Sequence, residues 1–154
     1  MKKVVFICVL SLLVLFSANA QGFYFDIGVG VGTGRSLESG YGFGISIDGG
    51  FKMGYRPHDT LPLYFVGSIC FYFPYSYIFG IGLVYYPIPM LQLAGSMGVS
   101  ISPGRERGLA YDISLALDTG GRKNGFLMGT KFFNALHGRD FYFAIGVFAR
   151  YAYR

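Results

Sequence analysis

The sequence predicts an all-β protein, an eight-stranded antiparallel up-and-down transmembrane β-barrel that follows a cleaved signal peptide. Three observations predict this fold. Only 14% of the 154 residues are charged and 53% are hydrophobic, whereas about 25% charge is usual for a soluble domain. Prolines divide a long uncharged stretch into pieces of strand length. Large apolar residues alternate with small or polar ones almost to the end of the chain.

Residues 1–20 have the pattern of a secretory signal peptide. Two lysines precede the 13-residue apolar run 4–16, which is shorter than the ~20 residues that a membrane-spanning helix needs. Ala18, Asn19 and Ala20 then match the small-residue cleavage site of exported proteins. We therefore expect cleavage before Gln21 and a single transmembrane β-barrel domain over residues 21–154.

The stretch 60–104 contains 45 residues without one Asp, Glu, Lys or Arg. A helical membrane protein is one reading of such a stretch, but prolines cut it into the pieces 63–73, 75–86 and 90–102. Each piece is too short for a helical span and close to the ~9–11 residues of a tilted transmembrane strand. Because proline breaks helices and lacks a backbone donor, it fits the turns between strands.

Alternation of apolar and small or polar residues identifies the strands, because successive side chains of a strand point to opposite faces. The pattern recurs in eight segments. They are residues 23–32, 43–54, 63–73, 77–86, 91–102, 109–118, 126–133 and 141–153. The apolar positions are odd-numbered in all segments except 126–133, where they are even-numbered.

The two faces of these strands differ in charge, and this difference predicts which face points outward. The apolar face carries no charged residue. The other face combines Gly, Ser and Ala with Asp26, Asp48, Lys52, Asp112, Asp118, Lys131 and Arg150. A soluble barrel or sandwich would need a well-charged outer face, whereas a membrane barrel turns its apolar face to lipid and its small, polar face to the lumen. We therefore expect lipid contact at Ile45, Phe65, Ile81, Val99 and Ile145.

Charges inside such a narrow lumen are expected to pair, because a lone buried charge is costly. We predict a lumenal charge network. Its members are Asp26, Asp48, Lys52, Asp112, Lys131 and Arg150. Within it we expect a cluster of Arg150, Asp26 and Lys52 at the closing seam and a hairpin pair of Asp112 with Lys131. The alternative is that each charge meets only water.

No catalytic, cofactor-binding or metal-binding residue is predicted, and we expect no enzyme activity and no cofactor. The two histidines, His58 and His137, fall at opposite ends of the expected barrel, so they cannot share a site. Arg139 replaces the serine that a His-x-Ser catalytic pattern would need after His137. Cys70 is the one cysteine outside residues 1–20. Without residues 1–20, 11 Lys and Arg stand against 8 Asp and Glu, and this net charge of +3 is scattered, which disfavours nucleic acid as a partner.

The last strand alternates through Ile145, Val147, Ala149, Tyr151 and Tyr153. With the signal peptide and the eight short strands, this pattern resembles the small eight-stranded outer-membrane β-barrel superfamily, which includes the OmpA-like transmembrane domain and the OmpW-like proteins. The resemblance implies the cell outer membrane as location, with outer-membrane lipids and the barrel-assembly machinery as partners. The machinery reads the end of the chain in this family, where Phe is usual. In this sequence Tyr153 is penultimate and Arg154 is last.

Three functions are compatible with this resemblance. The first is a structural, membrane-integrity role with a plugged lumen, which the paired lumenal charges favour because they would block a narrow bore. The second is a narrow channel for small apolar molecules, as the OmpW-like resemblance implies. The third is a lipid-modifying membrane enzyme. The oligomeric state is not predicted.

Overall fold

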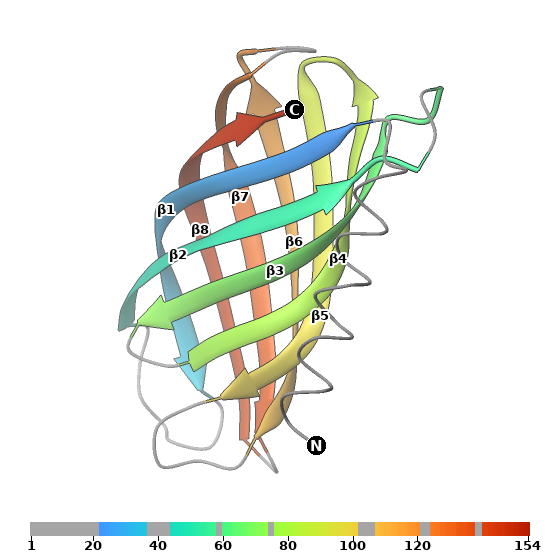
Figure 1. The fold of residues 1–154 in the computed structure, drawn as a ribbon. Coiled ribbons are helices and arrows are strands. Elements are labelled where there is room, and N and C mark those ends of the chain that lie inside the picture. The colour runs from blue at the N-terminus through green and yellow to red at the C-terminus, as the bar shows by residue number, and fades with distance from the viewer. Residues whose placement is uncertain are drawn as a thin grey trace, which may run out of the picture.

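A computed structural model describes residues 22–36, 44–57, 60–73, 76–101, 107–120, 124–137 and 140–154. Across these residues eight strands form one closed antiparallel barrel in chain order, and β8 pairs with β1 to close it (Figure 1). The strands are β1 (Phe23–Ser36), β2 (Gly44–Tyr55), β3 (Leu63–Phe73), β4 (Ser76–Ile88), β5 (Leu91–Ile101), β6 (Gly108–Asp118), β7 (Gly125–His137) and β8 (Asp140–Tyr153). The predicted eight-stranded antiparallel up-and-down β-barrel is confirmed.

The strand boundaries match the predicted segments closely except at two far ends. β1 continues from the predicted end at residue 32 to Ser36, and β7 continues from residue 133 to His137. In both places a polar residue occupies an apolar position of the alternation, Arg35 in β1 and Asn134 in β7. Pairing with β8 continues nevertheless, and backbone hydrogen bonding to this neighbour extends each strand where its side-chain pattern gives no signal.

The large apolar side chains point away from the barrel axis, as the alternation predicts. Phe65, Ile81, Val99 and Ile145 are all exposed on the outer surface, so the predicted orientation of these four is confirmed. The side chain of Ile45 lies outside the part that the structure describes. Among the described residues there is no helix with the length and hydropathy to cross a membrane.

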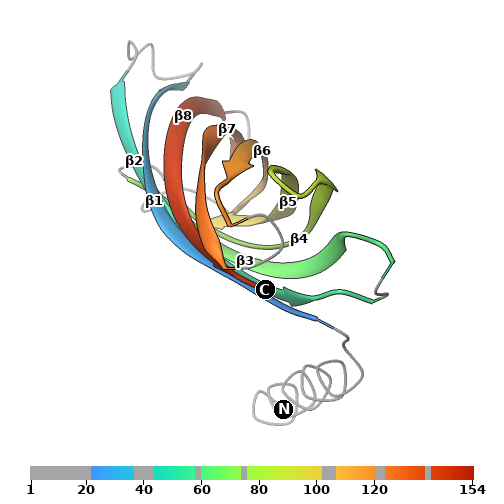
Figure 2. The same cartoon turned by 90° about the horizontal axis from the view of Figure 1, so that it is seen from above.

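The lumen contains two apolar clusters separated by polar side chains, inside the ring of strands that Figure 2 shows from above. Along β3, Tyr64 and Val66 belong to the first cluster and Cys70 and Tyr72 to the second, with the buried Ser68 between them. We call the end that holds the first cluster the terminal end, because β1 begins and β8 ends there, and the opposite end the far end.

Candidate functional site

The lumenal charge layer is the candidate site, because it gathers charged side chains from five strands in the interior. All six residues of the predicted network are buried. Asp26 comes from β1, Asp48 and Lys52 from β2, Asp112 from β6, Lys131 from β7 and Arg150 from β8. Each occupies an inward position of its strand, so the two-residue period of the sequence accounts for the shared direction.

The closing seam between β1 and β8 holds an ion pair of Asp26 and Arg150. Arg150 Nη1 lies 3.6 Å from Asp26 Oδ1, and the Tyr24 hydroxyl donates to Asp26 Oδ2 at 2.6 Å. Gly28 is the register partner of Arg150, and a Cβ at Gly28 would lie only 2.6 Å from Arg150 Cα. Glycine at this position therefore leaves the space through which the arginine crosses the seam.

Lys52 does not complete the predicted three-residue cluster. It stands opposite Asp26 in the β1–β2 register, but its Nζ lies 3.4 Å from Asp112 Oδ2 on the other side of the lumen. Ser96 donates to the second carboxylate oxygen of Asp112. Arg150 and Tyr24 already engage Asp26. The long Lys52 side chain therefore reaches across the lumen to Asp112.

The predicted hairpin pair of Asp112 and Lys131 is wrong. In the β6–β7 register Asp112 faces Phe133 and Lys131 faces Ser114, so the two residues are offset by two positions. Lys131 Nζ instead lies 2.8 Å from Asp48 Oδ1 and 4.6 Å from the centre of the Tyr72 ring. The hairpin is centred one residue later in the chain than a pairing of Asp112 with Lys131 requires, and a shift of one residue at the turn moves the register partner by two.

A fourth ion pair at the terminal end was missed by the sequence reasoning. Arg154 Nη2 lies 2.7 Å from Asp118 Oδ2, and the guanidinium stands 4.8 Å from the centre of the Tyr86 ring. The backbone N–H of Arg154 donates to Asn124 Oδ1 at 3.1 Å. The signal was present in the alternation, because even-numbered positions of the last strand face inward and residue 154 continues that series.

Aromatic side chains lie in the lumen on both sides of the charges. At the far end the Tyr72 and Phe133 rings stack with centroids 3.8 Å apart, and Tyr142 follows with its centroid 5.7 Å from that of Phe133. At the terminal end Gln92 donates to the hydroxyls of Tyr24 and Tyr86 at 2.8 and 2.7 Å. The sequence reasoning missed Gln92, since a single neutral polar residue on an alternating strand carries no distinctive signal.

Residue types that bind metals or act as nucleophiles are few in the described part of the chain. Among the described residues no group of three or more His, Cys, Asp or Glu side chains is placed to hold a metal ion. His58 and the His137 side chain lie outside the described part, and Cys70 is a buried free thiol. The three carboxylates of the layer are matched by its three cations, so its chemistry is mutual neutralisation across the lumen.

Comparison with known proteins identifies the fold and not a family. No family model matches the chain, and no curated protein is similar to it. Among solved structures, Ail, the attachment invasion locus protein of Yersinia pestis, is 16% identical over 84% of this chain and 98% of its own, with a TM-score of 0.58. Ail in complex with the heparin analogue sucrose octasulfate matches at 15% identity, 86% and 100% coverage and a TM-score of 0.61. A de novo designed transmembrane β-barrel matches at 13% identity, 87% and 98% coverage and a TM-score of 0.50.

Proposed function

We propose that this protein is an outer-membrane β-barrel with a plugged lumen and a structural, membrane-integrity role. The observation that carries the proposal is the separation of charge between the two faces of the wall. Among strand residues whose side chains the structure describes, Arg35 is the only charged residue on the outer face, and it lies near the far end of β1. All other charged side chains in those strands face the lumen.

A membrane is the solvent that suits this outer face. Exposed Ile, Leu, Val, Met and Phe side chains occur on every strand of the barrel, whereas soluble monomers rarely expose contiguous apolar patches beyond a few hundred Å². Exposed tyrosines lie near strand ends, as Tyr77, Tyr85, Tyr151 and Tyr153 illustrate. This placement is typical of the aromatic girdles of outer-membrane barrels. The fold shared with Ail supports the outer membrane as the location of this protein.

A plugged lumen is supported by the aromatic layers and ion pairs that cross it. Planar-bilayer recording of the purified protein tests this part, and we expect no steady single-channel current. Phe133→Ala removes the ring that stacks on Tyr72. This variant serves as the control, because loss of the ring should make conduction through the lumen easier than in the unmodified protein. Stable current through the unmodified protein would contradict the plug and favour the alternative function, a narrow channel for small molecules.

The proposal includes a non-enzymatic role. The carboxylates Asp26, Asp48 and Asp112 are each engaged by a cation. Mass spectrometry of lipid A and phospholipids from cells with and without the protein tests this role. We expect identical lipid masses, and a mass shift on expression would favour a lipid-modifying enzyme instead.

Export and assembly complete the proposal. Residues 1–20 act as the signal peptide, residues 21–154 form the barrel domain, and the barrel-assembly machinery inserts it among outer-membrane lipids. The intact mass of the protein extracted from membranes tests the first step. We expect the mass of a chain that begins at Gln21, and a mass that includes residues 1–20 would contradict it.

A further inference from the structure

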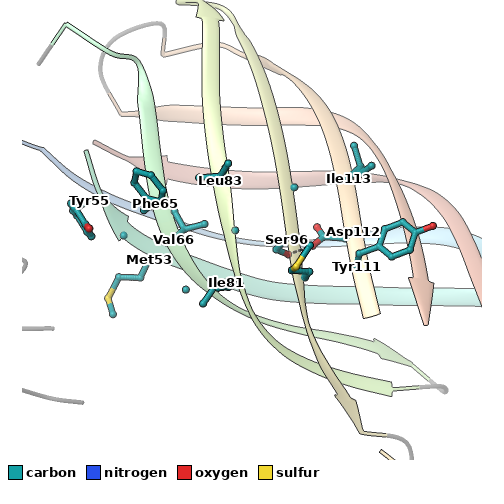
Figure 3. Close-up of a pocket in the computed structure, with 15 residues that line it drawn as sticks. Met53, Tyr55, Phe65, Val66, Ile81, Leu83, Ser96, Tyr111, Asp112 and Ile113 are labelled. Atoms are coloured by element: carbon teal, nitrogen blue, oxygen red, sulfur yellow. Dashed lines mark hydrogen bonds between the residues drawn. The ribbon is translucent and has the colours of Figure 1, made fainter. Parts of the chain in front are cut away.

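A groove on the outer surface of the wall stands apart from the lumenal site. It has a volume of about 780 Å³ and crosses the outward faces of β2 to β6. Most side chains around it are apolar or aromatic, including Met53, Phe65, Ile81 and Ile113 (Figure 3). Met97 also lines it. We call this feature the outer groove.

Two outward-facing glycines create the outer groove. A Cβ at Gly67 would find its nearest heavy atom, Met53 O, 3.9 Å away, and a Cβ at Gly95 would find Asp112 O at 3.5 Å. Neither glycine is therefore required by the packing of the chain itself. Ile81 is the register partner of Gly67, and at 73% exposure it is the most exposed large hydrophobic side chain described.

The third outward glycine in the described strands behaves differently. Gly49 is covered by the ring of its register partner Phe71, which occupies the place where a side chain would lie. The chain thus fills the space over Gly49 with its own atoms and leaves the space over Gly67 and Gly95 open. Glycine weakens a strand interior and often marks a place where another molecule approaches closely.

The lining limits the chemistry of an occupant. Ser96 and Asp112 also border the outer groove, but both are buried toward the lumen and bonded to each other, and Asp112 is paired with Lys52. No free charge therefore faces the outer groove from these residues. Because a polar group placed there would lose its hydrogen bonds to water, the occupant must be hydrocarbon.

The shape of the outer groove distinguishes a chain from a bulky partner. It extends across five strands, a distance of about 19 Å at the usual ~4.8 Å strand spacing. Along each strand it is lined by three consecutive residues, which span roughly 7 Å. A long, narrow depression of this kind matches one extended acyl chain, whereas a second barrel would present a broad convex surface to it.

We propose that the outer groove is a binding site for one acyl chain of a membrane lipid, which it holds in preference to the lipid that surrounds the rest of the barrel. The proposal rests on the proposed membrane location, since the groove lies within the apolar outer face. Gly67 and Gly95 provide the space, and Ile81 and Met97 provide the sides in contact with the chain.

The chain contains no tryptophan, so a single introduced tryptophan is a unique fluorescent probe. Met97→Trp places the probe at the outer groove, and Val147→Trp places the control on β8. Their side chains are 67% and 56% exposed. Both positions lie six residues from the terminal end of their strands, Leu91 in β5 and Tyr153 in β8, so the two probes have matched positions along their strands.

The experiment titrates dibromostearic acid, a quencher of tryptophan, into phosphatidylcholine vesicles that contain each variant. We expect the quenching of Met97→Trp to saturate as the quencher fraction rises, and the quenching of Val147→Trp to rise steadily. Half of the quenching of Met97→Trp should be reached at a quencher fraction several-fold lower than for Val147→Trp. Filling the outer groove by Gly67→Leu and Gly95→Leu should convert the saturating curve into the steady one. Ala149→Leu, which adds the same side chain on β8, should leave saturation unchanged.

Three results would overturn the proposal. Identical curves at both probes would mean that the outer groove has no preference for a chain. Saturation that survives the filling substitutions would place the site elsewhere. Protection of Met97→Trp at every quencher fraction would show that a second protein copy covers the groove. Brominated phosphatidylcholine supplies the control for membrane location, because failure to quench either probe would contradict the proposed function itself.

Discussion

The two faces of the barrel wall use glycine in opposite ways, and Gly82 and Gly67 show the difference on adjacent strands. Gly82 on β4 faces the lumen, where an added Cβ would lie 2.6 Å from Ser96 Cβ. Gly67 on β3 faces outward, where the nearest heavy atom would be 3.9 Å away. On the inner face, the packing of the chain against itself requires glycine. On the outer face, the space beside the glycine is left to the surrounding lipid.

Charge follows the same division. Inside, the carboxylates lie within 4 Å of a cation, as for Asp26 with Arg150 at 3.6 Å and Asp48 with Lys131 at 2.8 Å. Outside, apolar side chains meet the solvent directly. A substitution should therefore have a large effect on the inner face when it breaks a pair, and an effect on the outer face that depends on its depth in the membrane.

The largest effect is expected at the closing seam. Asp26→Ala leaves Arg150 buried without its carboxylate, and Arg150→Ala leaves Asp26 without its cation, so each should lower the free energy of unfolding by about 3–5 kcal/mol. The double variant should cost less than the sum of the single variants. Urea titrations of the barrel in lipid vesicles measure these values. Strictly additive costs would show that the two side chains do not stabilise each other.

An arginine on the outer face should have the next largest effect. Ile81 lies near the middle of β4 and Leu117 lies one residue from the end of β6, and both are exposed. Ile81→Arg should cost about 2–4 kcal/mol, and Leu117→Arg about 0–1 kcal/mol, because the penalty falls toward the membrane surface. The same urea titration compares them. Equal costs at the two depths would argue against lipid at this face.

A methyl group on the inner face should have a moderate effect. Gly82→Ala introduces a Cβ against Ser96 and the backbone of Gly95, and such overpacking typically costs about 1–3 kcal/mol. The loss should appear as a lower urea midpoint with an unchanged slope. A Gly82→Ala protein as stable as the parent would show that the lumen has more room than its geometry indicates.

The same substitution on the outer face should have the smallest effect and the opposite sign. The Cβ that Gly67→Ala adds would meet only Met53 O, at an ordinary contact distance of 3.9 Å. Because the alanine also reduces the conformational freedom of the unfolded chain, a gain of about 0.4–1 kcal/mol is expected. The urea midpoint should rise slightly. A loss as large as that of Gly82→Ala would remove the distinction between the two glycines.

The sequence predicts the faces of this barrel well because side-chain direction depends only on the two-residue period of a strand. It predicts ion-pair partners poorly, because the choice of partner also depends on the register of the strands and on how far each side chain extends across the lumen. Asp26 and Arg150 meet on adjacent strands at the seam, where counting from the strand ends is sufficient. Lys52 pairs with Asp112, and Lys131 pairs with Asp48, so each lysine binds a carboxylate that is far away in the sequence. Only the closed three-dimensional barrel brings those groups together.

The outer groove could not be predicted from alternation either. Gly67 and Gly95 occupy outward, apolar positions of the pattern. The sequence does not show whether the space above such a glycine is open or is filled by a neighbouring side chain. Their role becomes visible only when the atoms around them are known. The distinction between a glycine that is required by packing and one that leaves open space is therefore a property of the structure.

The central claim is that the chain forms a barrel whose apolar face lies in an outer membrane. Heat-modifiability on a denaturing gel, performed on isolated outer membranes, tests it most directly. A folded barrel resists the detergent at room temperature, so the unboiled and boiled protein should migrate differently, and the protein should be absent from the soluble fraction. Identical migration before and after boiling, or recovery in the soluble fraction, would contradict the account.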